Sequence, residues 1–298
     1  MILGRPNVGK STLLNRFLGE KIAIVSPKPE TTRNQLLGVL TQTDAQILFL
    51  DTPGIYHGPK TLLGKHQIQE AQEALHGADV FLLMTEAHIG LNDEDKQILR
   101  LLPKKREVMD AGAPVFLAIN KVDRVRKSLI LPQIQEAHRL YPFQEIFPIS
   151  ATGGENTPEL LRAIVAALPE GPALYPADHL TDRPVRTLVE ELVREKALLF
   201  THEEIPHAVA VLIEEWRPGK NARSAVSPLY IRATVYVERD SQKGILIGKG
   251  GALLKKIGEA ARKEIEPLAG NPVFLELWVK VAKNWRKDPV MLKRFGYG

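Results

Sequence analysis

The sequence predicts an α/β fold in which a parallel-rich sheet carries helices on both faces, followed by a smaller domain of the α+β class. Three observations support this assignment. Short apolar runs alternate with amphipathic helical stretches up to residue 150, which is typical of mostly parallel strands. Prolines and glycines are concentrated at residues 168–176, as expected between domains. Beyond residue 182 the expected order changes to helix, strand, strand, paired helices and strand.

The individual elements follow from the same pattern. In the first domain the apolar runs predict strands over residues 36–43, 46–50, 80–84, 114–119 and 146–149. In the second domain we expect a helix over 183–201, strands over 208–217 and 229–239, two helices around a glycine-rich loop, and a strand over 273–281. The predicted boundaries are a first domain over residues 1–170, a linker over 171–182 and a second domain over 183–298.

The strand that opens the first domain is expected to be short. Only Met1, Ile2 and Leu3 precede Gly4, whereas strands usually have about 5 to 6 residues. A segment missing before Met1, or a misassigned start, would explain this, and the short strand is expected to reduce stability.

Composition excludes several classes of protein. The chain has 298 residues, of which 44% are hydrophobic, enough for two cores. It has no cysteine, which excludes disulfides, thiol catalysis and thiolate metal sites and fits a reducing cytoplasm. No apolar run is long enough to cross a bilayer, and we expect no signal peptide. The eight histidines show no ligand spacing.

A phosphate-binding loop begins at Gly4. Residues 4–11 match the pattern G-x-x-x-x-G-K-[ST], in which glycines let successive backbone N–H groups face an anion. Lys10 is expected to meet the β- and γ-phosphates, and the hydroxyl of Ser11 to ligate Mg²⁺. The residues predicted to bind the nucleotide here are Gly4, Arg5, Pro6, Asn7, Val8, Gly9, Lys10, Ser11 and Thr12.

A second motif indicates guanine. Asn120, Lys121 and Asp123 follow an apolar strand, and the Asp123 carboxylate can accept hydrogen bonds from guanine N1–H and its 2-amino group. Asn120 is expected to brace the loop, while the stem of Lys121 lies along the base. Further on, Ser150 and Ala151 form the loop whose Ala151 N–H is expected to donate to guanine O6. Together the two motifs predict a GTP or GDP site.

Between these motifs lie the residues expected to sense the γ-phosphate. Asp51 ends an apolar strand and is predicted to join the Mg²⁺ shell, and the N–H of Gly54 is expected to reach the γ-phosphate. Thr32 is the preferred Mg²⁺ ligand from the polar loop, with Thr31 as the second choice. The predicted metal set is therefore Ser11, Thr32 and Asp51, and the predicted catalytic set is Lys10, Thr32 and Gly54.

The motifs GRPNVGKS, PETTR, DTPG, NKVD and SAT resemble the translation-factor class of GTPases, and with the C-terminal third they resemble the Era family within it. That third resembles a KH domain of the second topological type. The resemblance implies a GTPase that binds the 3′ end of small-subunit (16S) ribosomal RNA and assists small-subunit assembly. It also implies a K⁺ ion near Asn7.

Ile55 stands where many GTPases have glutamine, so intrinsic hydrolysis should be slow; Arg33 is a weaker candidate for a catalytic arginine.

The charge pattern supports RNA binding independently of the resemblance. Residues 183–298 contain 21 lysines and arginines against 14 acids, a net charge of +7, while residues 1–182 have 19 against 21. The glycine loop 248–251 is the kind that clamps about four nucleotides. The predicted RNA-binding residues are Lys243, Gly248, Lys249, Gly250, Gly251, Lys255 and Lys256.

Two other functions fit the same sequence. A basic domain could instead dock a protein or the anionic cytoplasmic face of a membrane, although such a surface needs no glycine loop. The chain could also hold GTP without turning it over. We expect a cytoplasmic monomer, with peripheral membrane contact as the alternative localisation.

Overall fold

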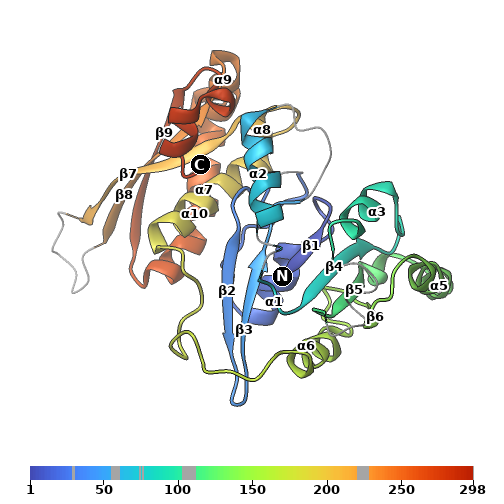
Figure 1. Ribbon diagram of the computed structural model, residues 1–298. Helices are drawn as coiled ribbons and strands as arrows, with labels where there is room; N and C mark the ends of the chain where they lie inside the picture. Colours follow the sequence, from blue (N-terminus) through green and yellow to red (C-terminus); the bar gives the residue numbers. More distant parts are fainter. Residues whose placement is uncertain are drawn as a thin grey trace. The chain divides into compact units, whose positions relative to one another are not determined.

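The computed structural model describes residues 1–28, 31–54, 61–73, 75, 77–102, 112–219 and 228–297. Its backbone contacts divide the chain into two compact units (Figure 1). The first unit comprises Met1–Ala23, Glu30–Lys60 and Gly64–Asp182, and the second comprises Ile24–Pro29, Thr61–Leu63 and Arg183–Gly298. No helix in the described residues is long and apolar enough to cross a membrane.

Six strands of the described chain form the sheet of the first unit, in the order β2-β3-β1-β4-β5-β6. All neighbours are parallel except β2 and β3, which form an antiparallel pair. The strands are β1 (Ile2–Gly4), β2 (Leu36–Thr41), β3 (Gln46–Asp51), β4 (Phe81–Glu86), β5 (Val115–Asn120) and β6 (Glu145–Pro148). The parallel-rich sheet is therefore confirmed. The short first strand has three residues and lies between β3 and β4.

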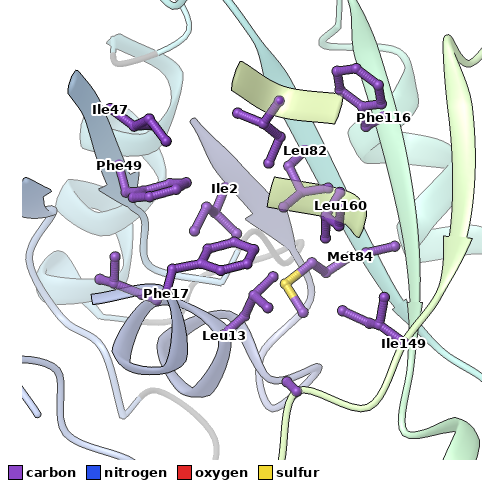
Figure 2. Packing of buried hydrophobic residues seen from close by; sticks show 14 of the residues in the cluster. Ile2, Leu13, Phe17, Ile47, Phe49, Leu82, Met84, Phe116, Ile149 and Leu160 are labelled. Atoms are coloured by element: carbon purple, nitrogen blue, oxygen red, sulfur yellow. The ribbon is translucent and has the colours of Figure 1, made fainter. Parts of the chain in front are cut away.

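Helices cover both faces of this sheet. The connections between strands contain α1 (Lys10–Leu18), α2 (Leu62–Glu73), α3 (Asp93–Leu99), η1 (Val122–Arg124), η2 (Lys127–Leu129), α5 (Ile130–Leu140) and α6 (Thr157–Ala166). On one face, Leu13 and Phe17 of α1 and Leu160 of α6 pack with Ile2 and Met84 of the sheet (Figure 2). α3 and α5 contribute to the core on the other face. Side chains alternate between the two faces of the sheet along β1, so Ile2 lies in one core and Leu3 in the other.

The segment 171–182, expected to be a linker, belongs to the first unit. Its backbone runs along the hairpin of β2 and β3. Val39 N–H donates to Leu180 O at 2.8 Å, and the Gln46 side chain bonds to the backbone of Leu174 and Tyr175. These hydrogen bonds tie the segment to β2 and β3.

The second unit is an α+β domain, as expected. Its three described strands have the order β7-β8-β9, with β7 antiparallel and β9 parallel to β8. α7 and α10 pack on one face of this sheet, where Val193 and Ile257 meet Ile213, Ala233 and Val279. The elements are α7 (Val185–Phe200), α8 (Ile205–Ala208), β7 (Ala210–Pro218), β8 (Leu229–Val237), α9 (Asp240–Ile247), η3 (Lys249–Gly251), α10 (Ala252–Ala269), β9 (Val273–Val281), η4 (Trp285–Lys287) and α11 (Pro289–Arg294).

Candidate functional site

The predicted phosphate loop connects β1 to α1. The Nζ of Lys10 donates hydrogen bonds to the carbonyl oxygens of Gly4 at 2.9 Å and Arg5 at 3.0 Å, so the lysine spans the loop. Gly9 has φ 105°, and a Cβ there would lie 2.3 Å from Nδ2 of Asn120. Only glycine therefore fits this position. Burial lowers the pKa of Lys10 to about 8, although the nearby Asp51 carboxylate opposes the shift.

Three oxygen-bearing side chains meet at the start of α1. Ser11 Oγ donates to Asp51 Oδ2 at 2.6 Å, and the hydroxyl oxygens of Ser11 and Thr32 lie 3.0 Å apart. Asp51 is fully buried, and its Oδ1 has no hydrogen-bond partner among the described residues. Burial raises the pKa of this carboxyl, while Lys10 and the Ser11 hydrogen bond oppose the rise. An unsatisfied buried carboxylate beside two hydroxyls fits a hard cation such as Mg²⁺. The Thr32 hydroxyl, the preferred candidate from the sequence, lies in this cluster.

Gly54 lies against the phosphate loop. A Cβ at this position would be 2.5 Å from the backbone nitrogen of Pro6, so the close approach requires glycine. The contact brings the segment after β3 to the place where a γ-phosphate is expected. Ile55, which the sequence analysis linked to slow hydrolysis, lies outside the described residues.

Asn120 joins the two loops that the sequence predicts to bind the nucleotide. Its Nδ2 donates to Val8 O at 2.7 Å, and its Oδ1 accepts from the backbone N–H of Ala151 at 2.9 Å. The side chain is buried, so these bonds brace the phosphate loop against the loop after β6. Ala151 N–H was expected to donate to guanine O6, whereas here it donates to Asn120. Ser150 Oγ accepts from Gly153 N–H at 2.9 Å and so orders the same loop.

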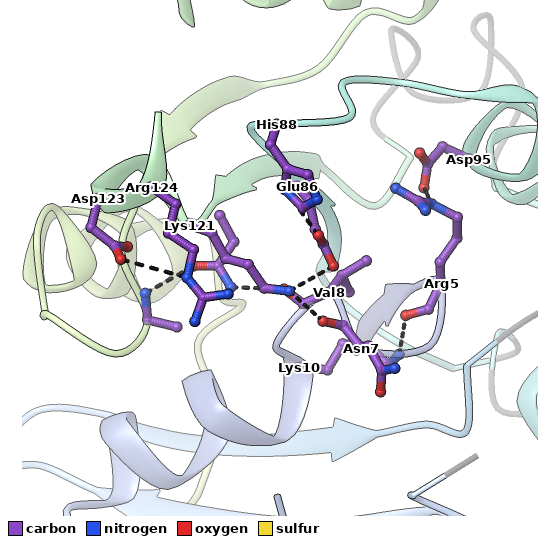
Figure 3. A network of polar contacts seen from close by, with 12 residues as sticks. Arg5, Asn7, Val8, Lys10, Glu86, His88, Asp95, Lys121, Asp123 and Arg124 are labelled. Carbon is purple, nitrogen blue, oxygen red and sulfur yellow. Dashed lines mark hydrogen bonds and ion pairs between the residues drawn. The ribbon is translucent and has the colours of Figure 1, made fainter. Parts of the chain in front are cut away.

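Lys121 crosses to the phosphate loop beside the expected position of the base (Figure 3). Its Nζ donates to Asn7 O at 2.8 Å and to Glu86 Oε1 at 2.7 Å. Glu86 ends β4 and also pairs with His88, Oε2 to Nδ1, at 3.2 Å. The side chain of Asp123 is 44% exposed, so its carboxylate is accessible to a ligand.

Sequence reasoning missed two acidic residues of this site. Glu86 ends the strand next to β5, and only the β4–β5 register brings it to Lys121. Asp95 is fully buried at the start of α3 and accepts from Arg5 Nε at 3.0 Å. It also forms a capping box with Asn92. The sequence signal of that capping box could have located the start of α3, but not its pairing with the phosphate loop.

The glycine loop of the second unit connects α9 to α10. Gly248, Gly250 and Gly251 have φ angles of 71°, 61° and 81°. Nothing lies within 4 Å of a Cβ built on Gly250 or Gly251, so backbone conformation, not space, favours glycine there. Lys249 is exposed between them. The loop thus presents its backbone to solvent at the N-terminus of α10.

A groove of about 440 Å³ runs beside this loop, between one face of α10 and β9. Lys255 and Arg262 are its basic residues, and Glu259 is its acid; Arg262 was not among the predicted RNA-binding residues. Lys256 is not among the lining residues, and its Nζ lies 4.3 Å from the centre of the Phe200 ring. Lys243 lies on α9 and does not line the groove. The complete lining is Gly251, Leu254, Lys255, Gly258, Glu259, Arg262, Phe274, Leu275 and Leu277.

Comparisons with known proteins match both units. A family described as 50S ribosome-binding GTPase matches residues 1–121, and the KH domain family matches residues 204–286. The GTPase Era of Lacticaseibacillus paracasei is 49% identical over 296 residues, which is 99% of this chain and 95% of that protein.

Two solved structures are similar along nearly the whole chain. A crystal structure of Era in complex with MgGDPNP and nucleotides 1506–1542 of 16S ribosomal RNA has a TM-score of 0.92 at 45% identity. A point variant of Aquifex aeolicus Era bound to GDP and AlF4⁻ gives the same TM-score and identity. Each alignment covers 100% of this chain and 97% of the other.

Proposed function

The chain belongs to the Era family of GTPases, and from this premise we propose that it is a switch protein that couples GTP to RNA binding. It binds and hydrolyses GTP, and its RNA target is the 3′ end of small-subunit (16S) ribosomal RNA. Its role is to assist assembly of the small ribosomal subunit. One observation carries the proposal: the described chain has a lysine-containing glycine loop braced beside a buried carboxylate, and also a groove with Lys255 and Arg262 beside an exposed glycine loop.

We assign the target to the small subunit because the two comparisons that name a ribosomal subunit cover different lengths of the chain. The family whose description names the 50S subunit matches only residues 1–121, whereas the relative solved with a 16S fragment matches the whole chain. A KH-type loop also suits the unpaired end of a ribosomal RNA, since it clamps single-stranded nucleotides.

In the nucleotide site, Lys10 would neutralise the β- and γ-phosphates and Gly54 N–H would contact the γ-phosphate. Ser11, Thr32 and Asp51 would hold Mg²⁺, which neutralises charge developing on the phosphate oxygens when bound. Because Thr32 and Gly54 both depend on the γ-phosphate, hydrolysis would release both segments. We propose a slow intrinsic rate, with K⁺ bound near Asn7 as a further source of positive charge.

The experiment is a titration of the full chain with a single-stranded oligonucleotide copying the 16S 3′ end, with a GTP analogue and with GDP. The variant Lys249→Asp with Gly250→Asp adds acids at the glycine loop and should abolish RNA affinity while keeping GTP binding. Lys287→Asp is the matched control, because Lys287 is an exposed basic residue of η4 in the same unit.

We further propose that the chain acts as a cytoplasmic monomer. The rival function, docking of the basic surface on a protein or an anionic membrane, predicts no oligonucleotide affinity in the unsubstituted chain. Peripheral membrane contact predicts binding to vesicles that contain phosphatidylserine, weakened by salt. If vesicles bind and the oligonucleotide does not, the RNA proposal is wrong.

A further inference from the structure

A row of three stacked side chains crosses the sheet of the second unit. Arg217 on β7, Tyr230 on β8 and Phe274 on β9 are register partners across adjacent strands. The Arg217 guanidinium lies 4.0 Å from the centre of the Tyr230 ring. The Tyr230 and Phe274 rings are 5.9 Å apart with 11° between their planes. Since β8 lies between β7 and β9, the arginine and the phenylalanine flank the tyrosine from opposite sides.

The row is held in place at its centre. The Tyr230 hydroxyl donates to Glu276, and the same carboxylate accepts from Trp278 Nε1 at 2.8 Å. Arg217 pairs with Glu215, Nε to Oε2, at 3.3 Å. These contacts fix the tyrosine ring and orient the guanidinium over it. Phe274 is therefore backed by a preorganised surface, which reduces the entropy lost when a ligand stacks on it.

The phenylalanine end of the row lies at the groove between α10 and β9. Phe274 is 60% exposed and lines the groove beside α10, whereas Tyr230 and Arg217 do not line it. β9 is the last strand of the three in this sheet, so the row ends where the groove begins. Gly251 and Arg262 lie in the same groove. Phe274 thus stacks on Tyr230 and also belongs to the lining of the groove.

We propose that Phe274, backed by Tyr230 and Arg217, is a base-stacking position at which one base of the bound single-stranded RNA lies against the ring. The inference rests on the proposed function and deepens it, because it assigns a ring contact in addition to the backbone clamp of the glycine loop. A flat aromatic surface next to basic side chains suits a nucleobase, whose π-face stacks on an aromatic ring irrespective of sequence.

The test uses the full chain with GTP analogue and 16S 3′-end oligonucleotides that carry 2-aminopurine at successive positions. Stacking on Phe274 should quench the fluorescence of one position. Phe274→Ala should restore that fluorescence and weaken binding about 5- to 150-fold, the range for loss of one stacked base. Phe274→Leu keeps an apolar side chain but has no ring, so its RNA affinity should fall nearly as much as that of Phe274→Ala. Phe274→Trp should retain RNA binding.

Two controls separate stacking from other effects. Val290 on α11 of the same unit is 75% exposed and does not line the groove, so Val290→Ala should leave RNA affinity unchanged. The salt dependence of binding should be unaltered in Phe274→Ala, since no phosphate contact is lost. In Lys249→Ala the slope of log K against log salt should fall by about 0.7 for one single-strand phosphate contact.

Equal affinity and equal fluorescence in Phe274→Ala and the unsubstituted chain would overturn the inference. So would full binding by Phe274→Leu, which would indicate apolar contact without stacking. In either case, loss of binding in the Lys249 and Gly250 double variant would leave the proposed function standing. Absence of oligonucleotide affinity in the unsubstituted chain would instead count against the proposed function itself.

Discussion

Glu86 and Lys121 form an ion pair of 2.7 Å at the carboxyl ends of neighbouring parallel strands, β4 and β5. The same Lys121 Nζ donates to the Asn7 carbonyl of the phosphate loop. Glu86 therefore holds Lys121 between the loop after β5 and the loop that connects β1 to α1, and we expect it to act as a positioning residue through Lys121. Its side chain is only 8% exposed, so the pair is screened less than a surface pair.

The first prediction concerns this pair. Glu86→Gln removes the negative partner of Lys121 from a buried position, and we expect GDP and GTP to bind roughly tenfold more weakly, or about 1.4 kcal/mol. Nucleotide titration by fluorescence measures the change. Lys96→Ala, which breaks the more exposed pair with Asp93, is the control and should leave affinity unaltered. If both variants lower nucleotide affinity by the same factor, Glu86 does not have this positioning role.

The second prediction concerns base selection. Asp123→Asn replaces a carboxylate acceptor by an amide that can donate, so it should weaken GTP by a few kcal/mol and admit xanthosine triphosphate. Competition between the two nucleotides measures the switch. Asp44→Asn, at an exposed position of the same unit, is the matched control. Unchanged GTP affinity in Asp123→Asn would contradict the guanine assignment.

The third prediction concerns K⁺. If K⁺ binds near Asn7 and adds positive charge beside the transferred phosphoryl group, hydrolysis should be faster in KCl than in NaCl at equal ionic strength. Phosphate release measures the two rates. Asn7→Ala should abolish the difference while nucleotide binding persists, since the bond from Lys121 uses the backbone carbonyl of residue 7. Equal rates in the two salts would exclude this role.

The fourth prediction follows from the pKa of Lys10, which burial lowers from 10.5 to about 8. Phosphate oxygens favour the charged ammonium, so binding of GDP should raise this pKa. Above pH 8 the free protein is largely deprotonated at Lys10 and must take up a proton on binding, so affinity should fall as the pH rises from 7.5 to 8.5.

Calorimetry in buffers of different ionisation enthalpy measures this proton uptake. Uptake should reach about three quarters of a proton at pH 8.5 and be small at pH 7, where Lys10 is already protonated. GDP is the suitable ligand because at pH 8.5 its phosphates are fully ionised and its guanine N1–H is still protonated. No uptake at pH 8.5 would show that the lysine pKa is not lowered in the free protein.

Candidate residues for the nucleotide site could be named from the sequence because such sites are built from short contiguous motifs. The spacing of Gly4, Gly9, Lys10 and Ser11 fixes how a loop can wrap a phosphate, whatever the rest of the chain does. The apolar runs likewise predicted the sheet, since a parallel strand buried on both faces needs an almost continuous apolar sequence. The placement of segment 171–182 depends on hydrogen bonds to β2 and β3, which no local pattern reveals.

The sequence by itself therefore determined the fold class, the phosphate loop, the guanine motif and the glycine loop. Only the tertiary structure decided which distant residues complete them: Glu86 beside Lys121, Asp95 beside Arg5, and Phe274 at the groove. The physical reason is that these partners come from different strands and helices. Their meeting depends on strand register and on which side of a sheet a helix packs, and both are set by burial of the whole core.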